Sequence, residues 1–498
     1  MKIKNYKGIK GGLIFKNFYG QQENKILDFP VPDYVILPLK QGFGNEVNPV
    51  VKIGDRVKIG QIIGIDDKNV STPIISTISG YVRDIFKKNY YGRETHFILI
   101  ENDGKEEFSE IKYSDKNWKE LSSYEIGEKL YLSGITSCGN SGIPTHFRSS
   151  VINPEEVEYV IVHGICSEIY NISLEKILEG KRMFEFVEGI KIIKKLFKNL
   201  KKFYLALNKY KEKLIEEIGK LTYEFDWLEI ALIEPKYPFG YDEVIIPLLL
   251  KKPFPYGYSA ANIGVISLNI RHVLYIYETI VMNKPFYEVI IGLCGNGFKE
   301  NLHLKVRIGT PLKKILERFL VDGKNIRIIW NSLLTGKEIS DYELPVDKNS
   351  SHLISIKENK ERKFLFFLRP GINSFSYTRT FLTASFIKKL PDTNKHGEER
   401  PCISCGYCQE VCPVNIIPHL LIKFIRKDII DERLMNYGIF NCIGCNLCSF
   451  VCPSKIQVSQ IIKEGQDKLV SIGCDRSQCI IPFFELKGLE EYKGIKKW

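Results

Sequence analysis

The sequence predicts a multidomain protein of mixed α/β and α+β class, and three observations support this prediction. The chain has 498 residues, 44% apolar and 26% charged, which suits a globular protein of about three or four domains. Its middle third alternates helical and strand patterns, as a parallel α/β domain does. Near its end one cysteine motif occurs twice, which indicates a small domain built around bound metal.

The cysteine count indicates a reducing compartment. Eight of the 13 cysteines fall in the repeated motif, and the other five are scattered and odd in number, so a disulfide framework is disfavoured. The sequence assigns no role to four of them: Cys138, Cys166, Cys474 and Cys479. No apolar run approaches the roughly 18 residues of a membrane span. The first residues lack a signal-peptide pattern, so we expect a soluble or peripheral protein.

The net charge of +12 is concentrated in the lysine-rich segment 191–213, where apolar residues recur at helical spacing. These are Ile192, Ile193, Leu196, Leu200 and Phe203. Two interpretations remain open: a solvated surface helix of the α/β domain, or a contact with anionic lipid or an acidic partner. No fold motif supports nucleic-acid binding, and we expect none.

Residues 1–118 are predicted to form a barrel-sandwich hybrid domain. Strand patterns alternate around the turns at Gly54-Asp55 and Gly60-Gln61, and a similar pattern follows at 78–85. This arrangement resembles biotinyl and lipoyl carrier domains. The carrier lysine is missing from the expected hairpin, so we interpret the module as structural.

Residues 119–258 are predicted to form a Rossmann-like parallel α/β domain. A helix is expected at Glu125–Ser133, and strands at Tyr159–Val162 and Trp227–Ile233. Two apolar runs, Val244–Leu250 and Val289–Cys294, are expected to be buried strands. A glycine-containing loop at 134–146 follows the first helix.

Residues 259–345 are predicted to form a β-grasp module of the soluble-ligand-binding type (SLBB). The segment from Val306 to Leu316 reads as a strand that turns at Gly309 into a helix, with Pro311 at the helix start, where its missing N–H costs nothing. A strand-containing linker at 346–395 follows, with its strand at Phe364–Leu368. The tail, 471–498, receives no assignment.

Residues 396–470 are predicted to form a helical domain with two [4Fe–4S] clusters, with its intervening helix at Ile417–Ile430. The motif C-x2-C-x2-C-x3-C-P starts at residue 402 and again at 442, which is 442 − 402 = 40 residues later. It is the ferredoxin-type signature, in which the fourth cysteine of each copy ligates the other cluster. One predicted ligand set is therefore Cys402, Cys405, Cys408 and Cys452, and the other is Cys442, Cys445, Cys448 and Cys412.

Structural zinc is the alternative for such cysteines. Zinc sites usually use two C-x2-C pairs rather than three closely spaced cysteines followed by C-P. Paired clusters are therefore the favoured interpretation.

The order of these modules resembles the RnfC subunit of the Rnf electron-transport complex and, equally, the NqrA subunit of the sodium-translocating NADH:quinone reductase. The segment 38–44 and the cysteine runs are similar to the Rnf subunit. The segments 331–336, 369–381 and 396–401 are similar to the quinone-reductase subunit, which usually lacks the cluster cysteines. The chain resembles a cluster-retaining relative of both.

The resemblance implies a flavin or dinucleotide site, which this chain retains only in part. The glycine-rich phosphate loop corresponds to 137–145, where two of four family glycines are replaced, and a second loop corresponds to 163–169. The retained site residues are Gly139, Gly142, Thr145, Gly164, Glu168 and Lys236. Because glycine loops bind phosphate through unobstructed backbone N–H groups, we expect weak binding of FMN or NADH. The alternative is a remodelled loop that holds the ligand through Glu168 and Lys236.

These features predict a peripheral electron-transfer subunit of an ion-translocating, Rnf- or Nqr-type oxidoreductase on the cytoplasmic face of the membrane. Its partners would be the membrane subunits and a redox protein or NADH, with two [4Fe–4S] clusters as the relay. Two alternatives stay open. The chain could be the NADH-oxidising flavoprotein subunit itself, or a non-catalytic docking scaffold whose clusters only stabilise its C-terminal domain.

Overall fold

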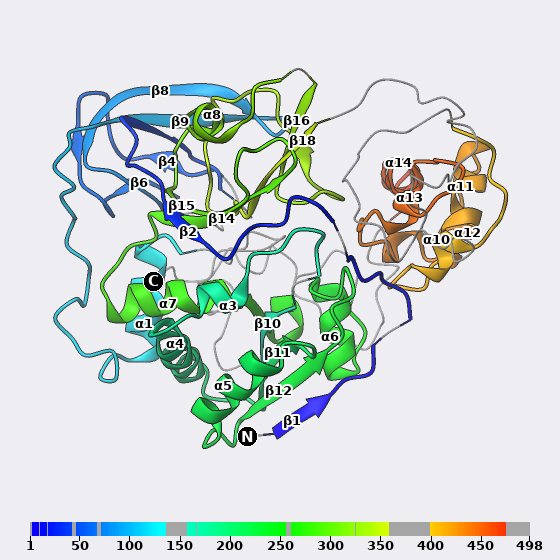
Figure 1. Ribbon diagram of the computed structural model, residues 1–498, viewed down its shortest axis with the longest axis horizontal. Helices are drawn as coiled ribbons and strands as arrows, with labels where there is room; N and C mark the ends of the chain where they lie inside the picture. Colours follow the sequence, from blue (N-terminus) through cyan, green and yellow to red (C-terminus); the bar gives the residue numbers. More distant parts are fainter. Residues whose placement is uncertain are drawn as a thin grey trace.

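The computed structural model describes residues 2–8, 10–16, 18–41, 46–66, 71–135, 157–165, 167–254, 260–323, 325–357 and 399–474. Four β-sheets and a C-terminal group of helices make up this part of the chain. Figure 1 shows the N-terminal strands above the α/β region, with the orange C-terminal helices to one side.

The N-terminal domain is a sandwich of two small antiparallel sheets. One has the order β3-β9-β8-β5 and the other β4-β6-β7. Their strands are β3 (Tyr34–Pro38), β4 (Asn48–Pro49), β5 (Arg56–Val57), β6 (Ile62–Ile65), β7 (Ile74–Ile75), β8 (Gly80–Tyr90) and β9 (Arg93–Asn102). Alternate residues such as Leu37, Ile63 and Val82 are fully buried between them, as the period of two predicts.

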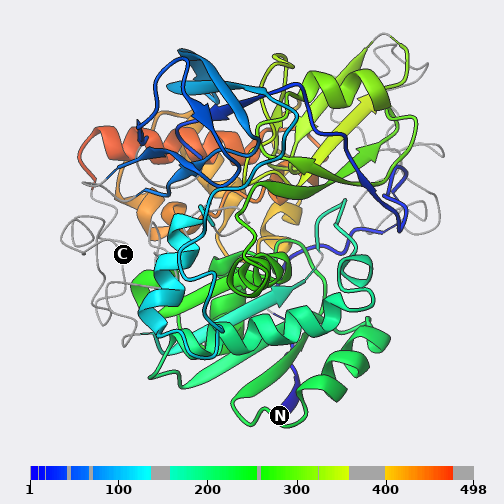
Figure 2. The same cartoon turned by 90° about the vertical axis from the view of Figure 1, so that its left-hand side faces the viewer.

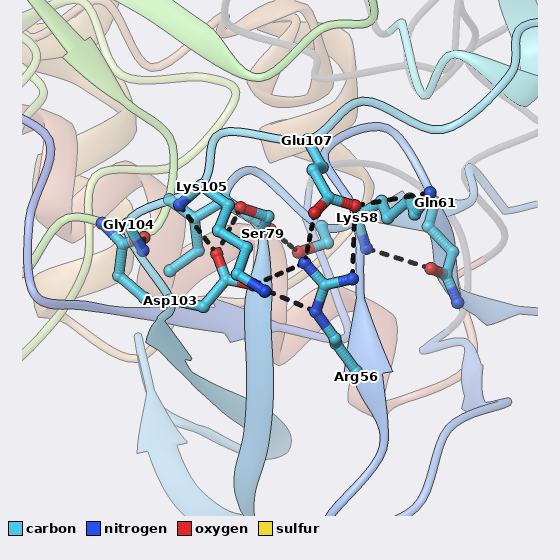
Figure 3. A network of polar contacts seen from close by, with 11 residues as sticks. Arg56, Lys58, Gln61, Ser79, Asp103, Gly104, Lys105 and Glu107 are labelled. Carbon is cyan, nitrogen blue, oxygen red and sulfur yellow. Dashed lines mark hydrogen bonds and ion pairs between the residues drawn. The ribbon is translucent and has the colours of Figure 1, made fainter.

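A polar network closes one end of this sandwich (Figure 3). The Arg56 guanidinium donates to Asp103 Oδ2 at 2.7 and 3.0 Å and to the Glu107 carboxylate at 2.8 and 3.2 Å. Ser79 Oγ donates to Asp103 Oδ1 at 2.7 Å, and together these bonds lower the pKa of Asp103 to about 2. The network ties β5 to the segment after β9, consistent with a structural module.

The α/β domain is a five-stranded sheet of order β1-β12-β11-β10-β13, and all its pairings are parallel. Its strands are β1 (Lys2–Asn5), β10 (Tyr159–Gly164), β11 (Lys202–Asn208), β12 (Leu228–Ile233) and β13 (Val265–Asn269). The chain runs outward from β10 to β12 and then returns to place β13 on the other side of β10. This reversal is a topological switch point, where ligands of open α/β sheets usually bind.

Both faces of the sheet are covered by helices. Val160, Leu205 and Ile230 belong to the core that includes helices α4 and α7, whereas Ile161, Ala206 and Ala231 belong to the core that includes α6. The helices are α1 (Ser123–Leu132), α3 (Leu174–Ile177), α4 (Arg182–Leu196), α5 (Glu212–Thr222), α6 (Asp242–Leu250) and α7 (Ile270–Val281). Alternating residues pack on opposite faces, so the parallel α/β prediction is confirmed.

A mixed six-stranded sheet of order β17-β16-β18-β14-β15-β2 follows. Its elements are β2 (Ile26–Asp28), β14 (Glu288–Gly295), β15 (His303–Arg307), α8 (Leu312–Phe319), β16 (Ile326–Trp330), β17 (Lys337–Glu338) and β18 (His352–Lys357). Figure 2 shows this sheet and the N-terminal sandwich above the green α/β domain.

These pairings divide the chain differently from the predicted ranges. β13 lies within the predicted 259–345 module but pairs with β10 of the parallel sheet. β18 lies within the predicted linker but occupies the middle of the mixed sheet, between β14 and β16. Long-range strand pairing leaves no local sequence signal at either boundary.

Two further predictions are wrong. Segment 191–213 is not one helix, because α4 ends at Leu196 and the buried strand β11 begins at Lys202. Val244–Leu250 lies in helix α6 rather than in a strand, because a short apolar run buried on all sides looks the same in either structure. Val289–Cys294 lies in β14, as predicted. The predicted strand Phe364–Leu368 is outside the described residues.

The C-terminal domain is a compact set of short helices. They are α10 (Tyr407–Glu410), α11 (Pro418–Arg426), α12 (Glu432–Asn436), η3 (Ile439–Asn441), α13 (Leu447–Phe450) and α14 (Val458–Ser471). The buried residues Leu421, Leu434, Phe440 and Ile462 form a core of their own around the cysteines. The helix predicted at 417–430 is α11. Among the described residues, no helix is long and apolar enough to cross a membrane.

The N-terminal segment connects the domains. After β1 it passes the C-terminal helices before it enters the sandwich (Figure 1). The Gly12 N–H donates to the Val411 carbonyl at 2.9 Å, and Leu13 exchanges backbone hydrogen bonds with Tyr237 at 2.8 and 3.1 Å. Residues 10–15 therefore lie between the cysteine domain and the α/β domain, and we call them the strap.

Candidate iron–sulfur centres

The two cysteine motifs fold alike. In each, the third cysteine lies in a single-turn helix, Cys408 in α10 and Cys448 in α13. The residue before that helix has a positive φ, 80° at Gly406 and 64° at Asn446. Glycine and asparagine tolerate this conformation best, and it turns the x2 loops tightly enough to gather three thiols.

The first group of thiols surrounds one cavity. Cys402, Cys405, Cys408 and Cys452 line one small cavity, together with mainly apolar side chains. The fourth cysteine comes from the second motif, as the crossed pattern predicts.

The second group forms around Cys412. Cys412 contributes electrostatically to the raised pKa of Cys442, Cys445 and Cys448. Its thiol therefore lies close to all three. The structure therefore brings the fourth cysteine of the first motif to the first three of the second.

Backbone N–H groups point at the sulfur atoms. Cys412 accepts from Val414, Asn415 and Ile416, and Cys452 accepts from Ser454 and Ile456. Such bonds stabilise thiolates and are one means by which proteins set cluster potentials.

Burial works in the opposite direction. It is the largest cause that raises the pKa of Cys408 to about 11 and of Cys445 to about 12. A thiol binds iron only as the thiolate, so metal binding must release these protons. Among the described residues no three His, Cys, Asp or Glu side chains could hold a single metal ion. In a [4Fe–4S] cluster each of the four thiolates binds a different iron, so the two crossed groups fit clusters.

The second group faces the rest of the protein. Cys445, Leu447 and Val451 share a core with Tyr237 and, at its margin, Phe15 of the strap. The Tyr237 hydroxyl donates to the Cys445 carbonyl at 3.0 Å, and Asn446 Nδ2 donates to the Leu334 carbonyl at 2.8 Å. The strap, the α/β domain and the loop between β16 and β17 of the mixed sheet therefore contact this region.

The first group faces outward. Cys405 is exposed, and Ile403 beside it is 67% exposed. The two thiol groups thus differ in environment, one buried at a domain interface and one open to the surface.

The predicted nucleotide-site residues fall into three sets. Gly139, Gly142 and Thr145 are outside the described residues. Gly164 ends β10, and a Cβ there would lie 2.4 Å from Ile270 Cδ1 and 2.7 Å from Leu174 Cδ1, so internal packing already requires this glycine. The Lys236 ammonium pairs with the Glu234 carboxylate at 3.3 Å. Glu168, the acidic residue of the predicted site, is also among the described residues.

Glu168 lies in the loop after β10, at the switch point of the sheet. Its side chain is half-buried and accepts a 2.9 Å hydrogen bond from Ser332 Oγ. Burial raises its pKa to about 7. Its charge adds to the effect of burial in raising the pKa of both Tyr237 and Tyr241, whose hydroxyls are 3.1 Å apart. Glu168 and the Cys445 loop therefore both lie near the same pair of tyrosines.

Tyr237, Tyr241 and Ser332 did not figure among the predicted site residues. A signal existed, because Tyr237 directly follows the predicted site residue Lys236, and Ser332 lies in segment 331–336, which is similar to the quinone-reductase subunit. Their spatial link to Cys445 appears only in the folded chain.

Three family models match the chain in order. The "RnfC Barrel sandwich hybrid domain" matches residues 7–105, the "Nuo51 FMN-binding domain" 130–278, and the "4Fe-4S dicluster domain" 401–456. The RnfC-type subunit of the proton-translocating ferredoxin:NAD(+) oxidoreductase complex from Clostridium ljungdahlii is 29% identical over 92% of this chain and 93% of its own length. The chain is similar to RnfC-type subunits over nearly its whole length.

Other curated relatives align less completely. The corresponding subunit of the ion-translocating oxidoreductase complex of Pseudomonas aeruginosa is 26% identical over 83% of this chain but only 49% of its own length. That of the Na(+)-translocating ferredoxin:NAD(+) oxidoreductase complex of Acetobacterium woodii is 23% identical over 80% and 83%. The chain thus spans about half the length of some curated relatives and most of others. The predicted resemblance to the Rnf subunit is confirmed.

Among solved structures, an NAD+-reducing [NiFe]-hydrogenase covers 76% of this chain and 67% of its own. Its TM-score is 0.44 and its identity 11%, too low to support a structural comparison.

Glu168 should make the stability of this chain depend on pH. Its folded-state pKa of about 7 lies above the ordinary value of 4.5. The stability associated with the protonated form is therefore present below pH 4.5 and lost as the pH rises to 7, about 3 kcal/mol at 1.36 kcal/mol per pKa unit. Glu168→Gln keeps an acceptor for Ser332 and should remove this dependence, which denaturant unfolding between pH 4.5 and 8 measures.

The matched control is Glu216→Gln on exposed helix α5. The pKa of Glu216 is lowered by its hydrogen bond with Lys220, so it titrates below this window and the wild-type slope should persist. Equal slopes in wild type and Glu168→Gln would contradict the prediction.

Proposed function

We propose that this chain is an electron-relaying subunit of an ion-translocating oxidoreductase complex, with two [4Fe–4S] clusters as its relay. The observation that carries the proposal is the crossed grouping of eight cysteines into one buried and one exposed centre. Bound clusters would supply one-electron transfer. The names of the relatives, subunits of ion-translocating complexes, support the same role.

Each residue group has a distinct task in this proposal. Cys412, Cys442, Cys445 and Cys448 hold the cluster nearest the sheet, and Cys402, Cys405, Cys408 and Cys452 hold the one nearest the surface. Tyr237 anchors the Cys445 loop to the α/β domain, which fixes the distance between the sheet edge and the inner cluster. The strap and the aromatic core around Phe15 exclude water from that side.

We propose further that a flavin or nicotinamide nucleotide binds at the carboxyl ends of β10 and β13. The match to an FMN-binding domain model and the switch-point position of Glu168 support this site. The weak binding of FMN and NADH that is expected from residues 137–145 stays a prediction. If the nucleotide binds weakly, electrons would enter the clusters from a partner protein instead.

One experiment separates the alternatives. The full chain, purified anaerobically and reconstituted, should contain about eight iron atoms and show two reducible clusters by EPR. Stoichiometric bound FMN with NADH-driven reduction would favour the flavoprotein alternative. Clusters that no partner protein or dithionite reduces would favour the scaffold, and four or fewer irons would contradict the relay.

The mixed sheet supports a β-grasp module of the SLBB type. Its hairpin β14-β15, helix α8 and later strands give the order β15-β14-β18-β16-β17, with β18 central. We propose the predicted ranges 1–118, 119–258, 259–345 and 396–470 as domains, with β1, β13 and α7 reassigned to the α/β domain and β2 and β18 to the β-grasp module.

The proposed location is the cytoplasmic face of the membrane, through contacts with membrane subunits. Alkaline carbonate should release such a chain from membranes, because a peripheral attachment lacks a spanning segment. Immunoblots of the washed pellet and supernatant measure this. Retention in the pellet, alongside an integral membrane protein of the same cells, would contradict the proposal.

A further inference from the structure

The wall of the outer cysteine cavity contains one unexplained polar side chain. Apart from the four cysteines its lining is apolar, except for His419 and Ser454. Ser454 Oγ donates to the Pro401 carbonyl at 2.9 Å, so its donor is used.

The His419 ring has a buried nitrogen, Nδ1, with no hydrogen-bond partner among the described residues. An unpaired buried polar atom costs free energy, and such groups usually have a partner that the bare protein lacks. The backbone of His419 is fixed at the same place, because its N–H bonds to Cys408 Sγ. The side chain therefore begins next to one of the four thiols.

The internal repeat supplies a comparison within the chain. At the 40-residue offset Cys408 corresponds to Cys448 and Ile422 to Ile462, whereas His419 corresponds to Ser459. The Ser459 N–H bonds to Ser449 Oγ at 3.0 Å rather than to a cysteine sulfur. The imidazole therefore distinguishes the outer centre from the inner one at an otherwise equivalent position.

We propose that His419 donates an N–H hydrogen bond to a sulfur of the outer cluster and so raises the reduction potential of that cluster above its value without the bond. This inference rests on the proposed function. Reduction adds one electron to the cluster and makes its sulfurs more negative. A donor aimed at them therefore stabilises the reduced state more than the oxidised state. His419 is a positioning residue here, because the cysteines alone hold the iron.

The test uses EPR-monitored redox titration of the full, reconstituted chain. His419→Leu removes the donor at similar volume, and we expect the equilibrium constant for one-electron reduction of the outer cluster to fall roughly tenfold, about 59 mV. His419→Asn places an amide N–H near the position of Nδ1 and should restore most of the shift. Ser459→Ala, the matched change in the other repeat, should leave the outer cluster unchanged.

Two readouts keep the outcomes distinct. Absence of clusters in the wild-type chain would overturn the proposed function, whereas assembled clusters with unchanged outer potential in His419→Leu would overturn this inference alone. If His419→Leu fails to assemble, pulsed EPR of wild-type chain whose histidines carry ¹⁵N only in the imidazole ring decides, because the backbone nitrogen of His419 is then silent. Hyperfine coupling of one histidine nitrogen to the outer cluster supports the bond, and its absence overturns it.

Discussion

Cys412→Ala should abolish the cluster of Cys442, Cys445 and Cys448 and spare the cluster of its own motif. The Cys412 thiol acts electrostatically on those three cysteines, while the cavity of Cys402, Cys405 and Cys408 is completed by Cys452. A cubane that loses one of four thiolates loses its protein ligand at one iron, so about half of the iron should be lost. Iron analysis and EPR of the reconstituted variant measure this.

Two companion variants make the result specific. Cys452→Ala should produce the reciprocal loss, removing the outer cluster and keeping the inner one. Cys474→Ala removes a half-buried thiol at the edge of the same core and should retain all the iron. Loss of the outer cluster in Cys412→Ala would overturn the crossed assignment.

Gly11→Ala should displace the strap from the cysteine domain. Gly11 has a φ of +86°, and a Cβ there would lie 2.4 Å from the Cys412 carbonyl oxygen. A left-handed φ costs an alanine about 1–2 kcal/mol, and the clash with backbone that cannot rotate away adds roughly 1–3 kcal/mol. We expect a marked loss of thermal stability and faster loss of inner-cluster iron to a chelator, because the strap borders Cys412.

Gly92→Ala is the matched control for this effect. Its φ of +88° is nearly the same, but a Cβ there meets no atom within 4 Å. It should show only the conformational cost, with iron retention unchanged. Equal destabilisation by the two substitutions would show that the contact between the strap and Cys412 contributes nothing.

Local patterns predicted much of the candidate site. The spacing of the cysteines identified all eight thiols and their crossed grouping, because the x2 loops dictate which sulfurs can meet. The alternation of helix and strand patterns predicted the parallel sheet, and Gly-Asp turns predicted the N-terminal sandwich. The residue patterns failed at Val244–Leu250, because a buried helix and a buried strand bury the same apolar side chains. They also failed at 191–213, where lysines on a helix and on the following strand looked like one continuous helix.

The sequence by itself predicted which cysteines would bind iron and which family the chain resembles, because those features depend on residues close together along the chain. Only the tertiary structure decided that the group of Cys445 borders the rest of the protein, whereas the group of Cys405 faces the surface. It also placed β18 in the mixed six-stranded sheet, and Tyr237 near both Glu168 and Cys445. These relations join residues up to several hundred positions apart. They follow from how whole sheets and helices bury their apolar faces against one another, which no short sequence window records.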